Sequence, residues 1–288
     1  YTKVAQVVAE EFGIDAGRVR ITATTTGKVP NTSATAASSG ADMNGMAAKQ
    51  AATIIRQRMI DHAAKAWKVP KSQIRFEAGQ VHIGKASISF GELAKKCHAA
   101  RVSLSSTGFY ATPKVQWDRA KGKGRPFFYF SYGAACAEVT IDTLTGEYQV
   151  ERADVLEDVG RSLNPAIDIG QVEGGFVQGV GWLTTEELWW DDKGQLRTHA
   201  PSTYKIPLAS DVPREFNVRL VAWSVNKEPA IGRSKAVGEP PLCLGYSVVE
   251  ALSMAVAAVA DYRLHPNLDM PVTPERVLMG VERLRGAG

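Results

Sequence analysis

Cysteine and histidine are scarce in this 288-residue sequence, and their spacing excludes several classes of site. The three cysteines, Cys97, Cys136 and Cys243, stand far apart and include no CxxC pair. Such spacing argues against a disulfide framework, a structural zinc site and an iron–sulfur cluster carried by this chain. The five histidines show no HxxxH or HxH spacing, so we expect no metal held by side chains. A reducing compartment, the cytoplasm, fits this composition.

Long apolar runs and strong net charge are also lacking. The apolar stretch 251–260 is too short to cross a bilayer, and no charged leader precedes an apolar run at the start, so we expect no membrane segment. The net charge is +4, but the basic residues are scattered, which argues against nucleic-acid binding. The first residues, YTKVAQVVAEEFG, already follow an amphipathic helical pattern. We interpret the chain as the interior of a longer protein.

With 44% apolar and 22% charged residues, the chain has the composition of a globular protein with a large core. Helices and strands are interspersed without strict βαβ alternation or internal repeats, so the expected fold class is α+β, with mixed sheets and packed helices. Capping and periodicity predict helices over residues 1–13, 42–65, 89–98 and 246–262, one that starts at 164–165 and one that starts at 273–275. Strands are predicted over 19–26, 73–77, 80–84 and 86–90, in an alternating pattern over 102–158, and on both sides of a turn at 192–194. We interpret the basic glycine loop 119–126 as a mobile surface connection.

Glycines crowd the helix that starts at Asn164 and Pro165. Gly174, Gly175, Gly179 and Gly181 fall within eight residues, and each costs about 1 kcal/mol relative to alanine. We expect this loss of helix propensity to be offset by the close packing of another group against the bare helix face. That group is either a second helix or a bulky cofactor.

A lone carboxylate, Glu239, stands between Gly238 and the pair Pro240 and Pro241. Because proline restricts the residue before it, we expect Glu239 to be held extended on a rigid segment. It is either a solvated loop residue or a positioned functional group. The neighbouring Lys235 either pairs with this carboxylate or extends into solvent.

A stretch of small and hydroxyl residues precedes the helix predicted at 42–65. Hydroxyls and backbone N–H groups ahead of a helix suit an anion, because the helix start presents unpaired donors and a positive dipole end. The alternative is an N-capping loop rich in Ser and Thr. The NTS at Asn31 is formally a glycosylation acceptor, which we interpret as ordinary loop.

Five collinear strings between residues 30 and 242 carry a family resemblance: PNTSATAASSGADMNGMA, GFYATP, SLNPAIDIGQVEGGFVQG, APSTYKIP and SKAVGEPPL. Together they resemble the C-terminal molybdopterin-binding domain of the xanthine dehydrogenases, a branch of the molybdenum hydroxylase family. The resemblance covers nearly the whole chain. It implies residues 1–158 as a first half of the molybdopterin-binding region and residues 159–288 as a second half, containing the glycine-rich helix and Glu239.

The resemblance also implies a reaction and a general base. This family hydroxylates a carbon of an electron-poor heterocycle, here a purine (hypoxanthine or xanthine to urate), and a glutamate takes the proton from the attacking hydroxyl. Glu239 matches that glutamate. A desolvated carboxylate has a raised pKa, which suits a general base. Aldehydes or other azaheterocycles are alternative substrates, and a cofactor-free structural fragment is an alternative role.

The cofactor implied is molybdenum held by molybdopterin. The positions that match its binding residues are Thr35, Ser38, Ser39, Gly40, Ala41 and Gln171. Gly40 and Ala41 offer backbone N–H groups only, whereas Gln171 offers a donor and an acceptor. Ala36 and Ala37 match small residues beside the substrate.

The resemblance further implies partners outside this chain. FAD and two 2Fe-2S clusters are expected on other domains or subunits, because this sequence has neither a dinucleotide fingerprint nor the necessary cysteines. The remainder of the molybdenum domain is expected upstream. The complete enzyme is expected to be a homo-oligomer.

Overall fold

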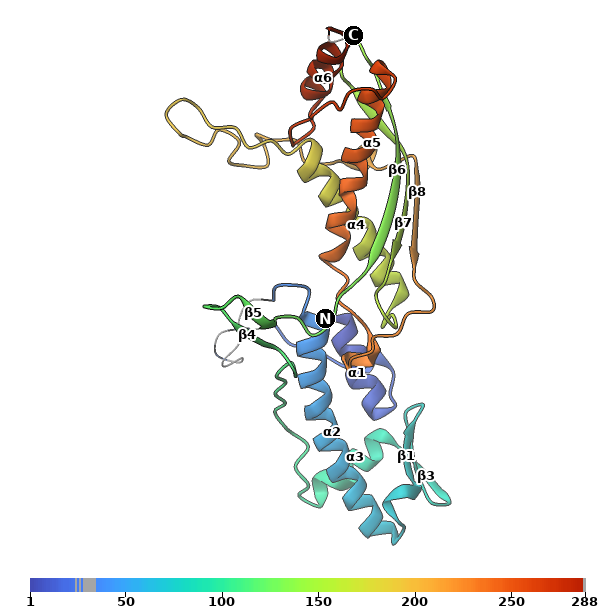
Figure 1. Cartoon of the computed structure of the whole chain (residues 1–288). Coiled ribbons are helices and arrows are strands. Elements are labelled where there is room, and N and C mark those ends of the chain that lie inside the picture. Colours follow the sequence, from blue (N-terminus) through green and yellow to red (C-terminus); the bar gives the residue numbers. More distant parts are fainter. Residues whose placement is uncertain (24, 26, 28–34, 287–288) are drawn as a thin grey trace. The chain divides into compact units, whose positions relative to one another are not determined.

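Two units with separate cores make up the chain in the computed structural model, which describes residues 1–23, 25, 27 and 35–286 (Figure 1). Unit 1 comprises residues 1–129 and 227–233, and unit 2 comprises residues 130–226 and 234–288. Both combine helices with small sheets, so the α+β class is confirmed. The boundary predicted at residues 158/159 divides the molybdopterin-binding region into two halves rather than into units with separate cores, and it stays a prediction.

Unit 1 packs helices against a three-stranded antiparallel meander. Its elements are α1 (Thr2–Phe12), η1 (Ala16–Arg18), α2 (Gly40–Trp67), η2 (Lys71–Gln73), β1 (Ile74–Glu77), β2 (Gln80–Ile83), β3 (Ala86–Ser89), α3 (Phe90–Ala99), β4 (Gln116–Asp118), β5 (Lys123–Arg125) and η4 (Ile231–Arg233). Helix α1 ends at Gly13, whose φ of 59° is left-handed, and a Cβ there would lie 2.4 Å from the Phe76 carbonyl oxygen. Ser89 accepts a hydrogen bond from the Glu92 N–H at 3.1 Å, so the predicted cap of α3 is confirmed.

Buried side chains from these elements form the core of unit 1. They are Phe12, Ala52, Met59, Ile60, Ala63, Ile74, Val81, Ile83, Leu93 and Cys97. Helix α2 contributes one apolar stripe, and β2, the central strand, contributes Val81 and Ile83 on alternate positions.

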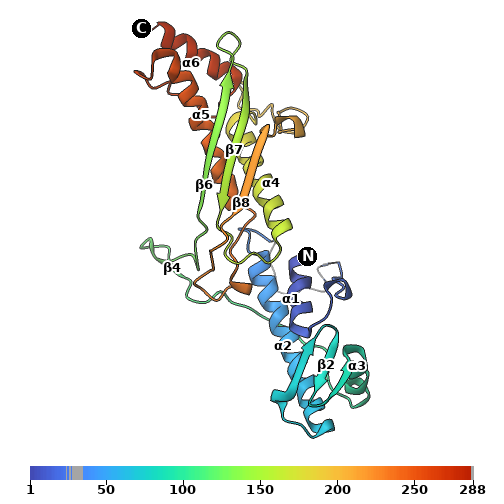
Figure 2. The ribbon, with the colours of Figure 1, turned by 90° about the vertical axis from the view of Figure 1, so that its right-hand side faces the viewer.

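Unit 2 packs two long helices on one face of a three-stranded sheet (Figure 2). Its elements are β6 (Gly133–Ile141), β7 (Tyr148–Glu157), α4 (Pro165–Thr184), η3 (Ala209–Asp211), β8 (Glu215–Leu220), η5 (Pro240–Gly245), α5 (Tyr246–Ala257), η6 (Ala258–Ala260) and α6 (Pro274–Gly286). Strand β7 is central, antiparallel to β6 and parallel to β8. The predicted cap of α4 is confirmed, since Asn164 Oδ1 accepts from the Ile167 N–H at 3.2 Å.

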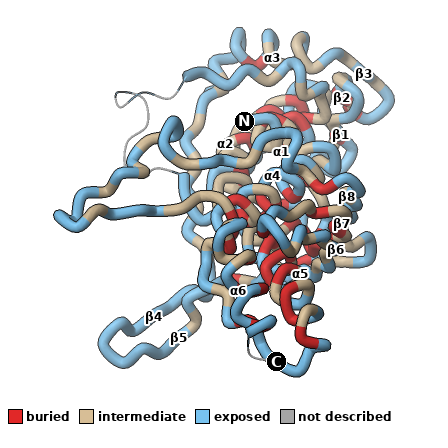
Figure 3. Tube along the Cα trace, turned by 90° about the horizontal axis from the view of Figure 1, so that it is seen from above, coloured by how far each residue is buried: buried red, intermediate tan, exposed pale blue. Residues whose placement is uncertain are grey.

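The core of unit 2 lies between the sheet and these helices, and Figure 3 shows buried residues along α5. The stretch Pro240–Ala260 is apolar enough to cross a membrane by length and composition, with a mean hydropathy of 1.8, when the described residues are searched. Five α5 residues are nevertheless buried in this core: Val248, Val249, Leu252, Val256 and Ala257. Their burial favours a core helix over a membrane span.

Two strand predictions are wrong, and a third, over 102–158, is wrong for residues 102–115, which form no strand. The described residues of 19–26 form no strand, because β-branched residues need a partner strand to pack against and these are mostly exposed. On either side of the 192–194 turn only one bridge forms, between Trp190 and Leu196. Side chains take the backbone donors there: Asp191 accepts from the Lys193 and Gln195 N–H groups, and Thr198 accepts from that of Trp189.

The basic loop 119–126 lies at the surface, as expected, and contains a short strand that was not predicted. Residues 123–125 form β5, which pairs with β4 as a hairpin. Arg125 then forms an ion pair with Glu228 at 2.6 Å, and Lys114 reaches the same carboxylate at 2.8 Å. This double ion pair fixes the base of the hairpin. Asn31 lies outside the described residues.

Candidate functional site

The predicted cofactor loop turns sharply into the start of α2. Ala37 and Ser38 have φ values of 54° and 51°, a conformation that is uncommon for residues other than glycine. The Ser39 hydroxyl donates to the Ala36 carbonyl at 2.8 Å. Thr35, Ala36 and Ala37 are exposed, whereas the residues from Ser38 to Ala41 are half-buried.

The start of α2 fits an anionic group. Ser39 is the N-cap residue but makes no capping bond with its side chain, so the simple N-capping interpretation fails for this residue. The N–H groups of Gly40 and Ala41, in the first turn, have no intrahelical acceptor by helix geometry. Hydroxyls of Thr35, Ser38 and Ser39 stand just before them. The donor set therefore suits the phosphate of a pterin cofactor.

One carboxylate lies at the same helix start. Asp42, in the first turn of α2, accepts a hydrogen bond from the Tyr129 hydroxyl. Burial raises the pKa of Asp42 although this bond and Lys3 lower it. A raised pKa favours the neutral form, which reduces repulsion of a bound anion.

The glycines of α4 make room for η5, the short helix that directly follows Glu239. A Cβ on Gly175 would lie 3.1 Å from Pro241 Cβ and 3.2 Å from the Gly238 carbonyl oxygen. One on Gly179 would lie 2.2 Å from the Leu242 carbonyl oxygen. Of the two alternatives, a second helix or a bulky cofactor, it is therefore the second helix that approaches α4 at these two positions. Apart from the adjoining backbone of α4 itself, no described atom lies within 4 Å of a Cβ built on Gly174, so no other segment covers that position.

Glu239 is the N-cap residue of η5 and its side chain is exposed. Its backbone has φ −100° and ψ −36°, so the expectation of an extended conformation is wrong. Pro240 instead occupies the first helical position, where a proline is tolerated because its missing N–H would have no intrahelical acceptor. The expectation of a desolvated carboxylate is also not met within this chain. The backbone after Glu239 is closely packed, since η5 contacts α4 at Gly175 and Gly179, and the rigidity of the segment stays a prediction.

Gln171 is exposed on α4, one turn before Gly175. A helical turn advances about 5.4 Å, so Gln171 lies just N-terminal to the point where Gly238 touches the helix. Unit 2 thus brings Gln171 and the segment of Glu239 to the same stretch of α4. The cofactor loop at residues 35–41 belongs to unit 1.

A buried charged cluster in unit 2 was not predicted from the sequence. The Lys235 ammonium donates to the Asp158 carboxylate, and their side chains are only 8% and 11% exposed. Asp158 also accepts from the Gly160 N–H at 2.8 Å and from the Ser224 hydroxyl. Burial alone would raise the pKa of Asp158, but these hydrogen bonds lower it below its usual value. Lys235 therefore takes neither of its predicted roles.

Glu157, next to this pair, is 1% exposed. Its Oε1 atom has no hydrogen-bond partner among the described residues. Burial, and then the charge of Asp158, raise the pKa of Glu157 to about 7. Gly133 is its cross-strand partner, and a Cβ on Gly133 would lie 2.2 Å from Glu157 Oε2. A glycine on β6 thus makes room for the carboxyl group.

A signal for this burial exists in the sequence. Ala153, Val155 and Glu157 alternate along β7 and all are buried, whereas Asp154 and Leu156 between them are half-buried and exposed, respectively. Period two places every second residue on one face of a strand. If the alternation of buried apolar residues is extended to Glu157, it predicts that this carboxyl group is buried.

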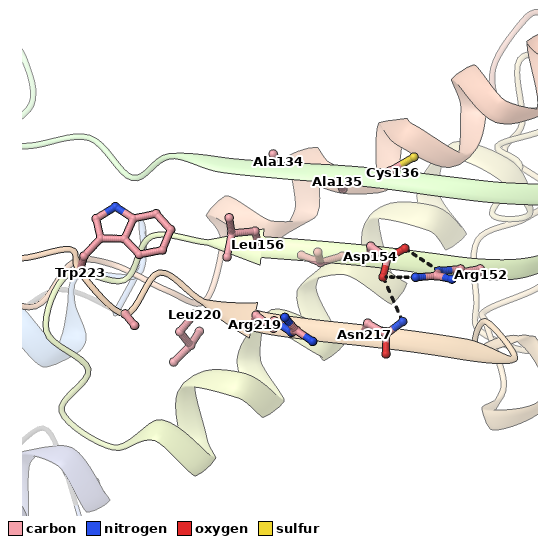
Figure 4. A pocket seen from close by; sticks show the side chains of 12 residues that line it. Ala134, Ala135, Cys136, Arg152, Asp154, Leu156, Asn217, Arg219, Leu220 and Trp223 are labelled. Carbon is pink, nitrogen blue, oxygen red and sulfur yellow. Dashed lines mark hydrogen bonds and ion pairs between the residues drawn. The ribbon is translucent and has the colours of Figure 1, made fainter.

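The other face of this sheet carries an open groove (Figure 4). Arg152 forms an exposed ion pair with Asp154 at 2.6 Å, and Asn217 donates to Asp154 at 3.0 Å. Leu156 and Trp223 lie further along the groove. None of the predicted site residues lines it. Over the described ranges of the chain, no three His, Cys, Asp or Glu side chains are grouped closely enough to hold a metal ion.

Comparison with known proteins gives one family match and many relatives. A family model described as "Molybdopterin cofactor-binding domain" matches residues 1–213. Xanthine dehydrogenase of Oryza sativa subsp. japonica is 44% identical over 289 residues, which covers 97% of this chain and 20% of that protein. The enzyme of Dictyostelium discoideum is 47% identical and covers 96% and 19%. The chain thus spans about a fifth of the length of these curated relatives.

Solved structures share the fold. Quinoline 2-oxidoreductase from Pseudomonas putida 86 has a TM-score of 0.79 and 27% identity, and covers 98% of this chain and 35% of that chain. CO dehydrogenase from Oligotropha carboxidovorans has a TM-score of 0.82 at 22% identity, and covers 100% and 34%. At that identity the second likeness concerns the fold alone.

Proposed function

Since this chain belongs to the molybdopterin cofactor-binding domain family, we propose that it is part of a molybdenum hydroxylase that oxidises a purine, converting hypoxanthine and xanthine to urate. The observation that carries this proposal is the identity of 44–47% with xanthine dehydrogenases over nearly the whole chain. The packing of η5 on the glycines of α4 supports it, because this contact holds the segment of Glu239 in one place.

Two groups of residues are proposed to contact the cofactor. In unit 1 the hydroxyls of Thr35, Ser38 and Ser39 and the first N–H groups of α2 bind its phosphate and ring edges. Gln171 in unit 2 donates to and accepts from the cofactor through its amide. When bound, the molybdenum–molybdopterin cofactor supplies the oxygen transfer and the two-electron oxidation. The small side chains of Ala36 and Ala37 leave space for a flat substrate.

Glu239 is proposed as the general base that removes the proton from the attacking hydroxyl. A positioned base contributes about 10²–10⁴-fold to the rate. Its exposure in this chain is compatible with that role because parts of the complete enzyme outside this chain, the rest of the molybdenum domain among them, would exclude water from the site. A base held by η5 loses little of its effect to motion.

Several parts of the proposed enzyme lie outside this chain. FAD and the 2Fe-2S clusters would reside on other domains or subunits, in a cytoplasmic homo-oligomer. We therefore expect the purified 288-residue chain not to oxidise xanthine with a dye as electron acceptor. Turnover by the isolated chain would contradict the proposed division of the site.

The decisive experiment changes Glu239 in the complete enzyme. Both Glu239→Ala and Glu239→Gln should lower kcat by about 10²–10⁴-fold while the molybdenum content stays stoichiometric. Glu250→Ala, which removes another exposed carboxylate of unit 2, is the matched control and should leave kcat unchanged. Near-normal turnover by both Glu239 variants would overturn the assignment of the base.

Another azaheterocycle is a second candidate substrate, favoured by the likeness to quinoline 2-oxidoreductase. Steady-state rates of the complete enzyme with xanthine, quinoline and an aromatic aldehyde would separate the substrates. A cofactor-free structural role is distinguished by metal analysis: absence of molybdenum after expression with an adequate cofactor supply would support it.

A further inference from the structure

We propose that the buried ion pair between Lys235 and Asp158 is a positioning device for Glu239, which acts by fixing the segment 234–239 on the end of β7. This inference rests on the proposed function, because it assigns a task to residues that act through the general base. Lys235 and Asp158 are therefore positioning residues. They are not proposed to touch the substrate or the cofactor.

The first argument is the path of the chain between Ser234 and Glu239. Ser234 forms an isolated antiparallel bridge with Gly160, and the Lys235 N–H donates to the Val159 carbonyl at 2.8 Å. The Ser131 hydroxyl donates to the Ala236 carbonyl at 3.0 Å. The segment is thus bonded to the residues directly after β7 by one bridge and one further backbone hydrogen bond.

Its side chains anchor it further. Val237 is buried in the core of unit 2. The Asn226 side-chain amide, itself 2% exposed, donates to the Ser234 carbonyl at 2.8 Å. Gly238 then meets Gly175 of α4, and Glu239 begins η5. Every residue from Ser234 to Gly238 therefore has a contact that fixes its position.

The ion pair is a further anchor of this segment. Asp158 is itself immobilised, since its Oδ1 accepts from Gly160 and Ser224 while its Oδ2 accepts from Lys235. The Lys235 ammonium also lies 4.9 Å from the centre of the Tyr132 ring, a distance typical of a cation–π contact. A buried lysine with two such partners has little freedom to move. It fixes the backbone only four residues before Glu239.

A structural ion pair need not be buried, and the same sheet shows the alternative. Arg152 and Asp154 on β7 form a pair of similar separation whose side chains are 47% and 43% exposed. An exposed pair of this kind contributes little to stability. A buried pair carries a desolvation cost and is weak evidence for stability. The advantage of the buried pair over an exposed one is therefore that it holds the backbone of its segment in one defined position.

The test uses the complete enzyme with both charges replaced together, Lys235→Met with Asp158→Asn, so that no lone charge stays buried. The matched control is Arg152→Met with Asp154→Asn. The expected result is a kcat lowered by about 10- to 100-fold in the first variant, a KM within about threefold, and an unchanged molybdenum content. The control pair should keep its kcat. A kcat equal to that of the control would overturn the proposal.

Combination with Glu239→Ala separates positioning from a general structural role. If the pair acts through Glu239, its replacement should cost no further rate once Glu239 is absent. Reductions that multiply would overturn the proposal, as would loss of molybdenum in the pair variant. A normal kcat for Glu239→Ala alone would instead refute the proposed function, so the two failures are distinguishable.

A measurement without turnover completes the test. The Lys235 amide, bonded to Val159, should exchange with deuterium about tenfold faster or more in the pair variant than in the control. Lys235→Arg, which keeps the charge, should restore most of the protection. Equal exchange in both pair variants would show that the ion pair does not hold the segment, and would overturn the inference.

Discussion

Replacing Glu157 by glutamine should remove a pH dependence that the buried carboxyl imposes on the stability of unit 2. In the folded chain its pKa is raised from the usual 4.5 to about 7. Because the folded state holds this proton more tightly than the unfolded state does, its stabilising effect is complete below pH 4.5. The effect is lost as the pH rises through about 7.

The magnitude follows from the two pKa values. Each pKa unit corresponds to about 1.4 kcal/mol, so a rise from 4.5 to about 7 corresponds to about 3 kcal/mol of unfolding free energy. The wild-type chain should lose most of this amount between about pH 4.5 and pH 7, the interval between the unfolded and the folded pKa. The neighbouring Asp158, whose pKa is lowered, loses its contribution only in more acidic solution and does not distort this window.

Urea unfolding of the 288-residue chain at several pH values provides the assay. Across this pH window, the unfolding free energy of Glu157→Gln should change by about 3 kcal/mol less than that of the wild type. A buried glutamine amide without a hydrogen-bond partner lowers the unfolding free energy by about 1–3 kcal/mol at every pH. The readout is therefore the slope of the unfolding free energy against pH, and not its absolute value.

Glu138→Gln, an exposed carboxyl on β6, is the control and should keep the wild-type slope. Infrared spectroscopy adds a direct measurement, because the carbonyl band of a protonated carboxyl near neutral pH should vanish in Glu157→Gln only. Identical slopes for wild type and Glu157→Gln would refute the reasoning, since they would mean that the buried carboxyl titrates normally.

Two further predictions concern packing and capping. Gly179→Ala should destabilise unit 2 by about 1–3 kcal/mol, because its Cβ would lie 2.2 Å from the Leu242 carbonyl oxygen. Gly174→Ala, where no other segment is near, should stabilise α4 by about 0.5–1 kcal/mol. Urea unfolding measures both changes, and equal effects would contradict the packing argument. Ser89→Ala should cost about 1 kcal/mol, because the bond from the Glu92 N–H to the Ser89 hydroxyl is lost. Thermal unfolding measures this cost, and Ser87→Ala on β3 should show a smaller one.

Local signals predicted many of the elements correctly. The caps at Ser89 and Asn164, the end of the first helix at Gly13 and the alternation of the short strands depend on residues only a few positions apart. Such interactions act within one turn or one hairpin and need no knowledge of the rest of the fold. The strand predicted at 19–26 failed because β-branched residues indicate a strand only where another strand pairs with them.

The candidate site divides in the same way. The resemblance singled out Glu239, Gln171 and the loop 35–41 from their local strings, and their assigned roles stay proposals. Which body approaches the glycines of α4 could not be deduced from composition, because a second helix and a cofactor both require a bare helix face. The η5 contacts of Gly175 and Gly179 answer that question for these two positions.

By itself, the sequence determined the α+β class, most caps and helices, and the family resemblance, since these depend on short-range chemistry and on the order of strings along the chain. Only the tertiary structure decided that Lys235 pairs with Asp158 and that Glu157 is buried opposite Gly133. Lys235 and Asp158 are 77 positions apart, and their pairing depends on how the segment 234–236 is added to the end of β7. Strand register is a long-range property, so the partner of a charge is fixed only when the sheet is complete.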